Sequence, residues 1–209
     1  MTRGSRGRLI VLEGGEGAGK STQASFVEGW LRERGREVVR TREPGGSPLA
    51  EEIRALVLRR WDEGIDGNTE LLLMFAARAA HLHAKIRPAL DAGRDVVCDR
   101  FVDATYAYQG AGRKLGTRTI DALARIVLGK LAPDLVILLD IDPVAGLARA
   151  KVRGAADRFE GEALAFQQRV RRAYRARARK QPRRYAVVDA SAPPAQVSTA
   201  IARALEWLR

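Results

Sequence analysis

A glycine-rich segment near the start of the chain has the residue types and spacing of a phosphate-binding loop. The segment Gly14-Gly15-Glu16-Gly17-Ala18-Gly19-Lys20-Ser21 matches the pattern G-x-x-x-x-G-K-[ST] in full. Its glycines allow successive backbone N–H groups to turn inward around phosphate oxygens. Lys20 can reach the β- and γ-phosphates of a nucleoside triphosphate, and the Ser21 hydroxyl can bind Mg²⁺. The motif alone suits a GTPase, a motor, a DNA-handling ATPase or a small-molecule kinase, and an ordinary glycine-rich turn is the alternative interpretation.

Asp99 and Arg100 form a second candidate group, because they end an apolar segment later in the chain. A carboxylate at the tip of a buried strand can hold Mg²⁺ directly or through water. The guanidinium beside it can bind a second phosphate group with two parallel hydrogen bonds. We therefore expect Asp99 near the metal and Arg100 facing the reaction centre. A plain surface ion pair between the two is the alternative.

Arginines near residue 150 are candidates for a mobile cationic segment. Arg149 and Arg153 are four residues apart, which places them on one face of a helix, and Arg158 follows. Between them, Gly154-Ala155-Ala156 indicates a flexible connection. Phosphoryl transfer uses such arginines to neutralise transition-state charge, and closure of the segment excludes water. The pattern predicts a short mobile lid at about 149–160, with a solvated basic helix end as the alternative.

Two further features indicate a pocket for a base. Phe75 and Arg78 are three residues apart on a predicted helix, so one can stack on a base while the other bonds its edge. Taken alone, Phe75 also fits a core residue. The run Thr105-Tyr106-Ala107-Tyr108-Gln109-Gly110 supplies polar side chains soon after Arg100, and by itself it indicates only a polar loop.

The elements that position these residues are predicted from the alternation of apolar and helical segments. Continuous apolar runs indicate strands that are buried on both faces, as in a parallel sheet. The predicted strands cover 9–13, 38–41, 95–99, 135–141 and 185–189, and the predicted helices cover 21–34, 48–60, 70–92, 117–130, 143–153, 163–181 and 194–208. This order predicts a doubly wound α/β sheet that binds ligands at the carboxyl ends of its strands. No repeat or linker divides residues 1–209, so we expect one domain.

The composition indicates an anionic partner without selecting one. The 37 basic and 25 acidic residues give a formal charge of +12, which suits nucleic acid, a membrane surface or phosphorylated metabolites. Arginines recur at 169–184, where a solvated helix face is the simplest interpretation. The one cysteine, Cys98, allows no intramolecular disulfide and fits a reducing cytoplasm. No segment approaches the ~20 apolar residues of a membrane span.

Taken together, these segments resemble the bacterial thymidylate kinase family over nearly the whole chain. The Arg-Glu-Pro-Gly-Gly and Asp-Arg-Phe-Glu segments are much more specific to that family than the phosphate loop. The matching stretches, in order, are 13–22 (EGGEGAGKST), 41–46 (TREPGG), 99–101 (DRF), 107–110 (AYQG) and 149–160 (RAKVRGAADRFE).

The resemblance implies a P-loop NTPase fold with a five-stranded parallel sheet, helices on both faces and a short mobile lid. It also implies transfer of the γ-phosphoryl group of ATP to dTMP with Mg²⁺ as cofactor, in a cytoplasmic homodimer. Residues 14–22, including Thr22, would bind ATP, with Lys20 catalytic and with Ser21 and Asp99 at the metal. Arg149 would pack against adenine, opposite residues 189–191.

For the acceptor, the resemblance implies a role for each matching residue. Phe75 would stack on thymine and Arg78 would bond the carbonyl edge of the base, which Thr105 also helps to recognise. Tyr108 would crowd the 2′ position of the sugar, with Gln109 beside it. The remaining assignments are the sugar 3′-hydroxyl to Glu16, the acceptor phosphate to Arg100 and the catalytic lid arginine to Arg153.

Two rival functions stay open at this point. A kinase for another monophosphate, such as UMP or CMP, differs from a dTMP kinase only in side-chain geometry around the base. A basic ATPase or regulator that binds nucleic acid would use the arginines of 169–184 on the phosphate backbone. The chain carries no recognised nucleic-acid module, and its paired acceptor residues argue against that second rival.

Overall fold

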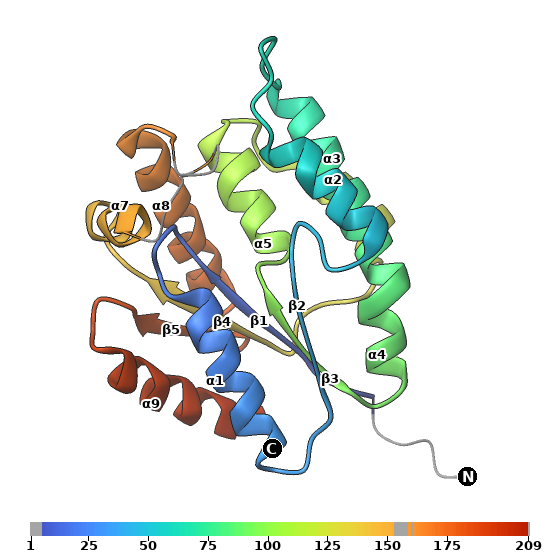
Figure 1. The fold of residues 1–209 in the computed structure, drawn as a ribbon, viewed down its shortest axis with the longest axis vertical. Coiled ribbons are helices and arrows are strands. Elements are labelled where there is room, and N and C mark those ends of the chain that lie inside the picture. The colour runs from blue at the N-terminus through green and yellow to red at the C-terminus, as the bar shows by residue number, and fades with distance from the viewer. Residues whose placement is uncertain (1–5, 153–158, 160, 209) are drawn as a thin grey trace.

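A five-stranded parallel sheet forms the centre of the computed structural model, which describes residues 6–152, 159 and 161–208. The strand order is β2-β3-β1-β4-β5 (Figure 1). The strands are β1 Leu9–Gly14, β2 Val38–Arg42, β3 Asp95–Asp99, β4 Leu135–Asp140 and β5 Tyr185–Asp189. The chain passes from β1 to the edge strand β2, returns to β3, and then crosses β1 to reach β4 and β5. The loop after β1 therefore lies where the strand order reverses, which is where sheets of this type bind ligands.

Helices connect each strand to the next one along the chain. The α-helices are α1 Lys20–Arg32, α2 Pro48–Leu58, α3 Gly67–His81, α4 Arg87–Asp91, α5 Val102–Thr105, α6 Arg118–Leu128, α7 Pro143–Val152, α8 Leu164–Lys180 and α9 Pro194–Leu205. Two π-helical turns, η1 Leu82–Ile86 and η2 Tyr106–Gly112, continue α3 and α5, and a short 3₁₀ segment, η3 Glu206–Leu208, follows α9.

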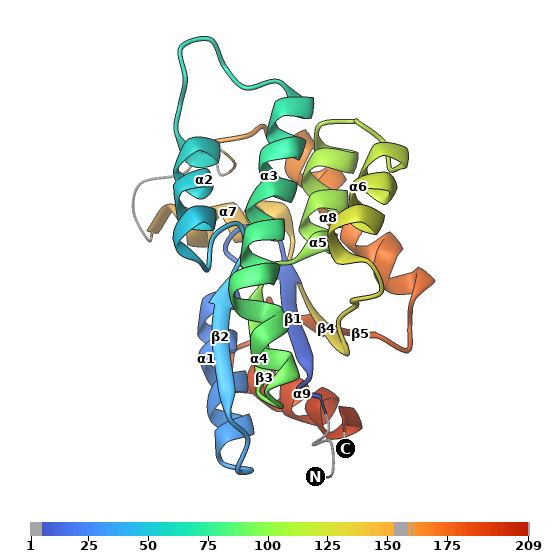
Figure 2. The ribbon, with the colours of Figure 1, turned by 90° about the vertical axis from the view of Figure 1, so that its right-hand side faces the viewer.

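Side chains alternate between the two faces of the sheet and so create two cores. Along β1, Leu9 and Val11 enter one core, while Ile10 and Leu12 enter the other. The first core lies under α3, α4, α5 and α8, and the second lies under α1 and α9 (Figures 1 and 2). Since both faces are covered, the continuous apolar runs of the sequence are explained, and the predicted α/β sheet with helices on both faces is confirmed.

The segment after β3 differs from its prediction as a polar loop. Residues 102–112 are helical, as α5 followed by η2, and their side chains include the fully buried Thr105 and Gln109. Threonine, tyrosine and glycine are weak helix formers, so residues 105–110 carry little helical signal. The helix is stabilised by tertiary packing instead, since η2 lies against α8. Burial of polar side chains on such an element marks a binding surface more than a solvated loop.

The basic run at 169–184 is only partly solvated. Arg171 of α8 pairs with Asp140, Arg177 pairs with Asp103, and Arg169 donates to the carbonyls of Ala111 and Gly112. The exposed members of the same helix include Arg172, Arg175 and Arg179. The inward arginines therefore attach α8 to the sheet and to η2, which corrects the simpler interpretation of a single solvated face.

Two expectations about the environment of the chain can be compared with the structure. Cys98 is fully buried in β3, and burial raises the pKa of its thiol well above the ordinary value. Among the described residues, no helix has the length and apolar character that crossing a membrane requires.

Candidate active site

The phosphate loop connects β1 to α1 through three glycines with positive φ. Gly14, Gly17 and Gly19 have φ values of 148°, 67° and 83°, which residues with a Cβ rarely adopt. At Gly17 an added Cβ would also collide with the backbone of Gly146 in α7, and a Cβ at Gly146 would meet the carbonyl oxygen of Glu16. The loop is therefore shaped by glycine backbone geometry and by close contact with α7.

Lys20 is held inside this loop by backbone carbonyl groups. Its Nζ donates to the carbonyl oxygens of Gly14 at 3.3 Å and Gly15 at 2.8 Å. Burial lowers the pKa of the ammonium group, and the nearby Arg100 lowers it further. Two cations lie together here, so an incoming phosphate would relieve their mutual repulsion. The predicted contact of Lys20 with phosphate is compatible with this placement.

Ser21 and Asp99 come together as the sequence predicts. The Ser21 hydroxyl donates to Oδ2 of Asp99 at 3.1 Å, because residue 99 ends β3 directly beside β1. A hydroxyl and a carboxylate form a suitable donor set for Mg²⁺, which usually takes few protein oxygens and completes its shell with phosphate and water. No group of three or more His, Cys, Asp or Glu side chains within the described ranges could hold a metal alone.

Arg100 lies between the phosphate loop and a neighbouring cleft. Its Nη1 donates to the carbonyl oxygen of Gly14 at 3.1 Å, and its Nη2 donates to Oε1 of Glu16 at 2.6 Å. The guanidinium also lies over the ring of Tyr108, with 4.8 Å between its Cζ and the ring centroid. Burial opposes the positive charge and is the largest single effect, but Glu16, Tyr108, Tyr174 and Asp99 together outweigh it and keep the pKa of Arg100 well above its ordinary value.

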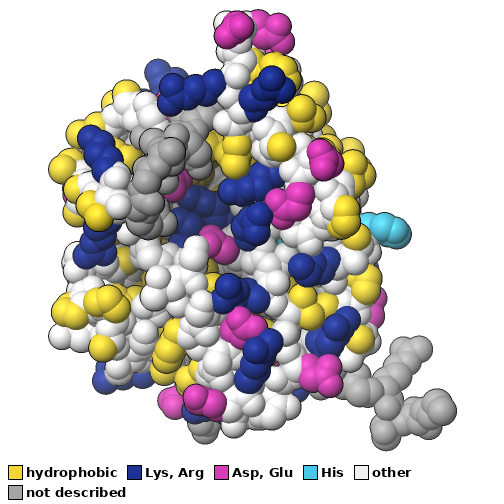
Figure 3. Space-filling view, in the orientation of Figure 1, with side chains coloured by type: hydrophobic (Ala, Val, Ile, Leu, Met, Phe, Trp, Pro, Cys, Tyr) yellow, Lys and Arg dark blue, Asp and Glu magenta, His cyan; other side chains and the backbone are white. Residues whose placement is uncertain are grey.

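A cleft opens beside Arg100, between α2, α3 and the helical segment after β3. Its lining residues include Glu16, Arg54, Met74, Arg100, Tyr108 and Gln109. The Tyr108 hydroxyl donates to Oε1 of Glu16 at 2.6 Å, so this carboxylate oxygen receives both the tyrosine and the arginine. Figure 3 shows Lys and Arg side chains gathered in a hollow near the middle of this face of the molecule. The geometry suits an anionic ligand next to the phosphate loop.

Phe75 does not lie where its predicted stacking role requires. Its side chain is 2% exposed and belongs to the hydrophobic core, while the preceding residue, Met74, lines the cleft. A helix turns about 100° per residue, so neighbouring side chains point in different directions. Phe75 is three residues and Met74 four residues before Arg78, and both spacings fall on one face of a helix, so spacing alone does not separate them. The observed placement of Phe75 in the core corrects the prediction.

Arg78 is buried, and two of its three guanidinium nitrogens donate hydrogen bonds to neighbouring groups. Its Nε donates to Oε2 of Glu43 at 2.7 Å and its Nη2 to the carbonyl oxygen of Phe101 at 3.1 Å. The other carboxylate oxygen of Glu43 lies 3.2 Å from Nδ1 of His81. In the part of the chain that the structure describes, Nη1 of Arg78 has no hydrogen-bond partner. A buried donor without a partner is costly, which suggests that a ligand satisfies it.

Two more buried polar atoms on the adjoining helical segment also have no partner among the described residues. They are Oγ1 of Thr105 and Oε1 of Gln109. The amide nitrogen of Gln109 donates to Oε1 of Glu70 at 2.7 Å, which fixes the direction of its oxygen. Thr105 and Gln109 follow Phe101, whose carbonyl bonds Arg78, at intervals of four residues. The structure thus brings the predicted substrate-binding residues Arg78, Thr105 and Gln109 onto adjoining elements.

Arg149 contacts the loop after β5 directly, whereas the resemblance implies only that the two lie on opposite sides of adenine. Its Nη1 donates to the carbonyl oxygen of Ala190 at 2.7 Å and its Nη2 to that of Ser191 at 3.1 Å. The loop itself is fixed by Asp189, whose Oδ1 accepts from the backbone N–H of Ser191 at 2.9 Å. The predicted lid arginines Arg153 and Arg158 lie outside the described residues.

Several residues of the site were missed from the sequence. Arg54 of α2 lines the cleft and donates to the carbonyl oxygen of Pro44 at 2.8 Å. Tyr174 of α8 lies within 3.4 Å of Nη1 of Arg100 through its hydroxyl. Glu13 is fully buried beneath Arg100. A lone arginine on a short helix and a tyrosine in a basic run give no chemical signal in a single sequence, and Glu13 precedes the phosphate-loop motif.

A phosphate loop beside a second, cation-lined cleft, on a doubly wound sheet, defines a P-loop kinase of the nucleoside monophosphate type. Comparisons with known proteins identify the family within this class. The model of the thymidylate kinase family matches residues 12–201. The chain belongs to this family.

Individual relatives agree over almost the full chain. The thymidylate kinase of Teredinibacter turnerae is 54% identical, with 96% of this chain and 98% of the relative covered. That of Pseudomonas putida strain W619 is 55% identical, with 92% and 93% covered. The crystal structure of thymidylate kinase from Ehrlichia chaffeensis superposes with a TM-score of 0.79 at 31% identity, and covers 96% of this chain and 99% of that one. The P-loop NTPase fold predicted from the sequence is thereby confirmed.

Replacement of the loop lysine tests the phosphate site directly. Lys20→Ala is expected to abolish nucleotide turnover while leaving the fold intact, because within the described residues the hydrogen bonds of the ammonium group go to the loop carbonyls of Gly14 and Gly15. Activity is measured by coupled ADP release, and folding by circular dichroism and thermal melting. Near-normal turnover in the folded variant would remove this loop from the mechanism.

Proposed function

We propose that the chain transfers the γ-phosphoryl group of ATP to dTMP, giving dTDP and ADP. One observation carries the proposal: Arg100 lines the cleft and also bonds the phosphate loop, at the Gly14 carbonyl and the Glu16 carboxylate. A donor phosphate on the loop and an acceptor phosphate on Arg100 would thus be held next to each other. Membership of the thymidylate kinase family supports dTMP as the acceptor.

On the donor side, residues 14–22 would surround the phosphates of ATP, with Lys20 near the β- and γ-phosphates. Ser21 and Asp99 would hold Mg²⁺, which supplies charge neutralisation to the phosphate oxygens when it is bound. Arg149 would pack against adenine, with residues 189–191 opposite. The hydrogen bonds from Arg149 to Ala190 and Ser191 make the two sides neighbours, and they would open to admit the base between them.

On the acceptor side, the sugar and base of dTMP would enter the cleft between Met74 and Tyr108. Among the described residues, three buried atoms near this cleft have no hydrogen-bond partner: a donor nitrogen on Arg78, the acceptor oxygen of Gln109 and the hydroxyl of Thr105. Such a set of donors and acceptors supports a pyrimidine base with two carbonyls and one N–H as the ligand. Groups of this kind discriminate strongly, because a ligand that leaves them unpaired loses binding energy. Glu16 would accept the sugar 3′-hydroxyl after exchanging one of its present donors.

The chemical step needs no general base. The acceptor phosphate is already anionic near neutral pH, since the second pKa of a phosphate monoester is ≈ 6. Positioning of the two phosphates and neutralisation of their charge carry the rate. The cations that this chain supplies are Lys20 on the loop, Arg100 at the acceptor and, by proposal, Arg153 from the lid. A lid over both nucleotides would exclude water, which competes with the acceptor.

A panel of acceptors tests this function. The purified protein is assayed with ATP and dTMP, dUMP, UMP, CMP, AMP or GMP at equal concentration. We expect dTMP to have the highest kcat/KM, by at least about tenfold over the ribonucleotides, because contacts to base and sugar discriminate by ~1–3 kcal/mol. If UMP or CMP leads the panel, the substrate proposal is wrong although the reaction class stands.

The lid arginine is tested by Arg153→Ala. An arginine that acts on transition-state charge lowers kcat, and we expect a loss of about 10³-fold with little change in dTMP affinity. The matched control is Arg172→Ala, which removes an exposed arginine from α8. Initial rates and equilibrium binding of dTMP are measured for both variants. A change confined to KM would make Arg153 a binding residue and direct attention to Arg149 or Arg158.

We also propose a cytoplasmic homodimer that pairs through the α3 and α6 faces. The two helices lie side by side (Figure 2), and each exposes a large apolar residue, Leu72 at 57% and Ile126 at 79%. Light scattering is expected to give twice the chain mass for the native protein and a shift toward the monomer for Ile126→Asp. The control Val187→Asp, on the exposed edge of β5, should remain dimeric. A native mass equal to one chain would contradict the proposal.

A further inference from the structure

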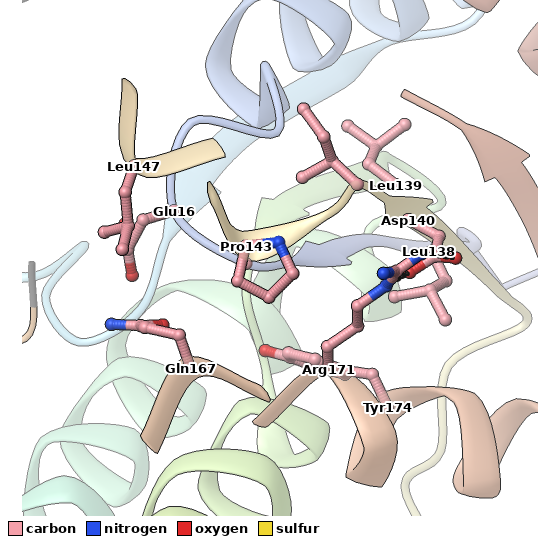
Figure 4. A pocket seen from close by; sticks show the side chains of 11 residues that line it. Glu16, Leu138, Leu139, Asp140, Pro143, Leu147, Gln167, Arg171 and Tyr174 are labelled. Carbon is pink, nitrogen blue, oxygen red and sulfur yellow. Dashed lines mark hydrogen bonds and ion pairs between the residues drawn. The ribbon is translucent and has the colours of Figure 1, made fainter. Parts of the chain in front are cut away.

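Tyr174 is a buried polar residue that the proposed chemistry does not use. It lies on α8 behind the phosphate loop, where Figure 4 shows it with Gln167 and Arg171 of the same helix, facing a small pocket that Glu16 also lines. Its side chain is 1% exposed, and it is not among the residues that line the acceptor cleft. A tyrosine hydroxyl this deeply buried needs hydrogen-bond partners.

Those partners are Glu13 and Arg100. The Tyr174 hydroxyl donates to Oε2 of Glu13 at 2.8 Å, and Nη1 of Arg100 lies 3.4 Å from the same hydroxyl oxygen. A phenol has one proton to donate. Because Glu13 receives that proton, the oxygen lone pairs of Tyr174 are left to accept from the guanidinium. The Glu13 carboxylate therefore sets the direction in which Tyr174 acts on Arg100.

Glu13 itself is held without contact to the cleft. It is fully buried in β1, and its Oε1 accepts from the backbone N–H groups of Phe101 at 2.8 Å and Ala104 at 3.2 Å. Phe101 immediately follows Arg100 in the chain, and Ala104 lies four residues after it. One carboxylate thus fixes the backbone after Arg100 with one oxygen and the hydroxyl beside its guanidinium with the other.

We propose that the Tyr174 hydroxyl, oriented by Glu13, is a positioning group that fixes the Arg100 guanidinium for the acceptor phosphate. The inference rests on the proposed function, in which Arg100 binds that phosphate. An arginine has a long side chain with many rotamers, and a ligand gains affinity when the protein has already fixed the binding conformation. The Gly14 carbonyl and the Tyr174 hydroxyl hold Nη1, whereas the Nη2 partner, Glu16, lies in the cleft wall.

The test compares two ligands that differ only in the group that Arg100 would bind. Equilibrium affinities for dTMP and for thymidine are measured by calorimetry, without ATP, for the native protein and for Tyr174→Phe. The variant keeps the ring, whose centroid lies 6.4 Å from that of Tyr108, and removes only the hydroxyl. We expect dTMP to bind about tenfold more weakly and thymidine to bind within about twofold of native, since a hydrogen bond to a charged group is lost. In kinetics, KM for dTMP should rise while KM for ATP stays constant.

The matched control is Tyr106→Phe, which removes a hydroxyl that donates to Asp121 at the surface. It should change neither affinity. Glu13→Gln serves as a second variant, because it keeps the size of the side chain and weakens the acceptor of the Tyr174 proton. The same selective loss of dTMP affinity is expected from it, by a smaller factor, and it provides the test if Tyr174→Phe does not fold.

The outcomes separate the inference from the function on which it rests. If the native protein binds thymidine as tightly as dTMP, Arg100 does not hold the phosphate and the proposed function is in error. If native binding favours dTMP and Tyr174→Phe keeps that preference, the positioning role is overturned. Equal weakening of both ligands, or a lower kcat at unchanged KM, would make Tyr174 a packing residue and would likewise overturn it.

Discussion

The backbone at Arg100 is the constraint on which the site depends. Its φ of 69° lies in the left-handed region, which costs a residue with a Cβ roughly 1–2 kcal/mol. The conformation is held by its neighbours: the N–H of Arg100 donates to the Leu12 carbonyl at 2.8 Å, and Cys98 Sγ donates to the Arg100 carbonyl at 3.0 Å. In this way the pairing of β1 with β3 directs the guanidinium back over the phosphate loop, where an extended strand would have carried it past.

Opposite charges around that residue offset the repulsion between the two cations of the site. Lys20 and Arg100 are close enough to disfavour each other, and Glu16 and Asp99 compensate them. Beneath them, burial raises the pKa of Glu13 and Asp103 adds to the rise, while Arg100 and the hydrogen bonds from Tyr174 and the Phe101 N–H lower it. Binding of polyanionic nucleotides to preorganised cations needs little reorganisation of the protein, which is the usual source of electrostatic catalysis.

The sequence was most informative where backbone chemistry dictates residue type. Glycines with positive φ, a lysine after them and apolar strands with polar ends predicted the phosphate loop, the sheet and the meeting of Ser21 with Asp99. It was least informative where side-chain direction decides. Met74 and Phe75 are both apolar and adjacent, so only the rotation of α3 about its own axis in the folded protein decides which of them faces the cleft and which faces the core. Likewise, the pairing of Arg171 with Asp140 depends on tertiary contact, which a run of arginines does not reveal.

Gly17 and Gly146 are in close backbone contact, so the phosphate loop and α7 constrain each other at this point. One belongs to the loop that would hold the donor phosphates and the other to the helix that carries Arg149, and neither position has room for a methyl group. If α7 moves, it must therefore rotate about this contact or move the phosphate loop with it. Through this backbone contact, a movement at the adenine end of the donor nucleotide would be transmitted to its phosphate end.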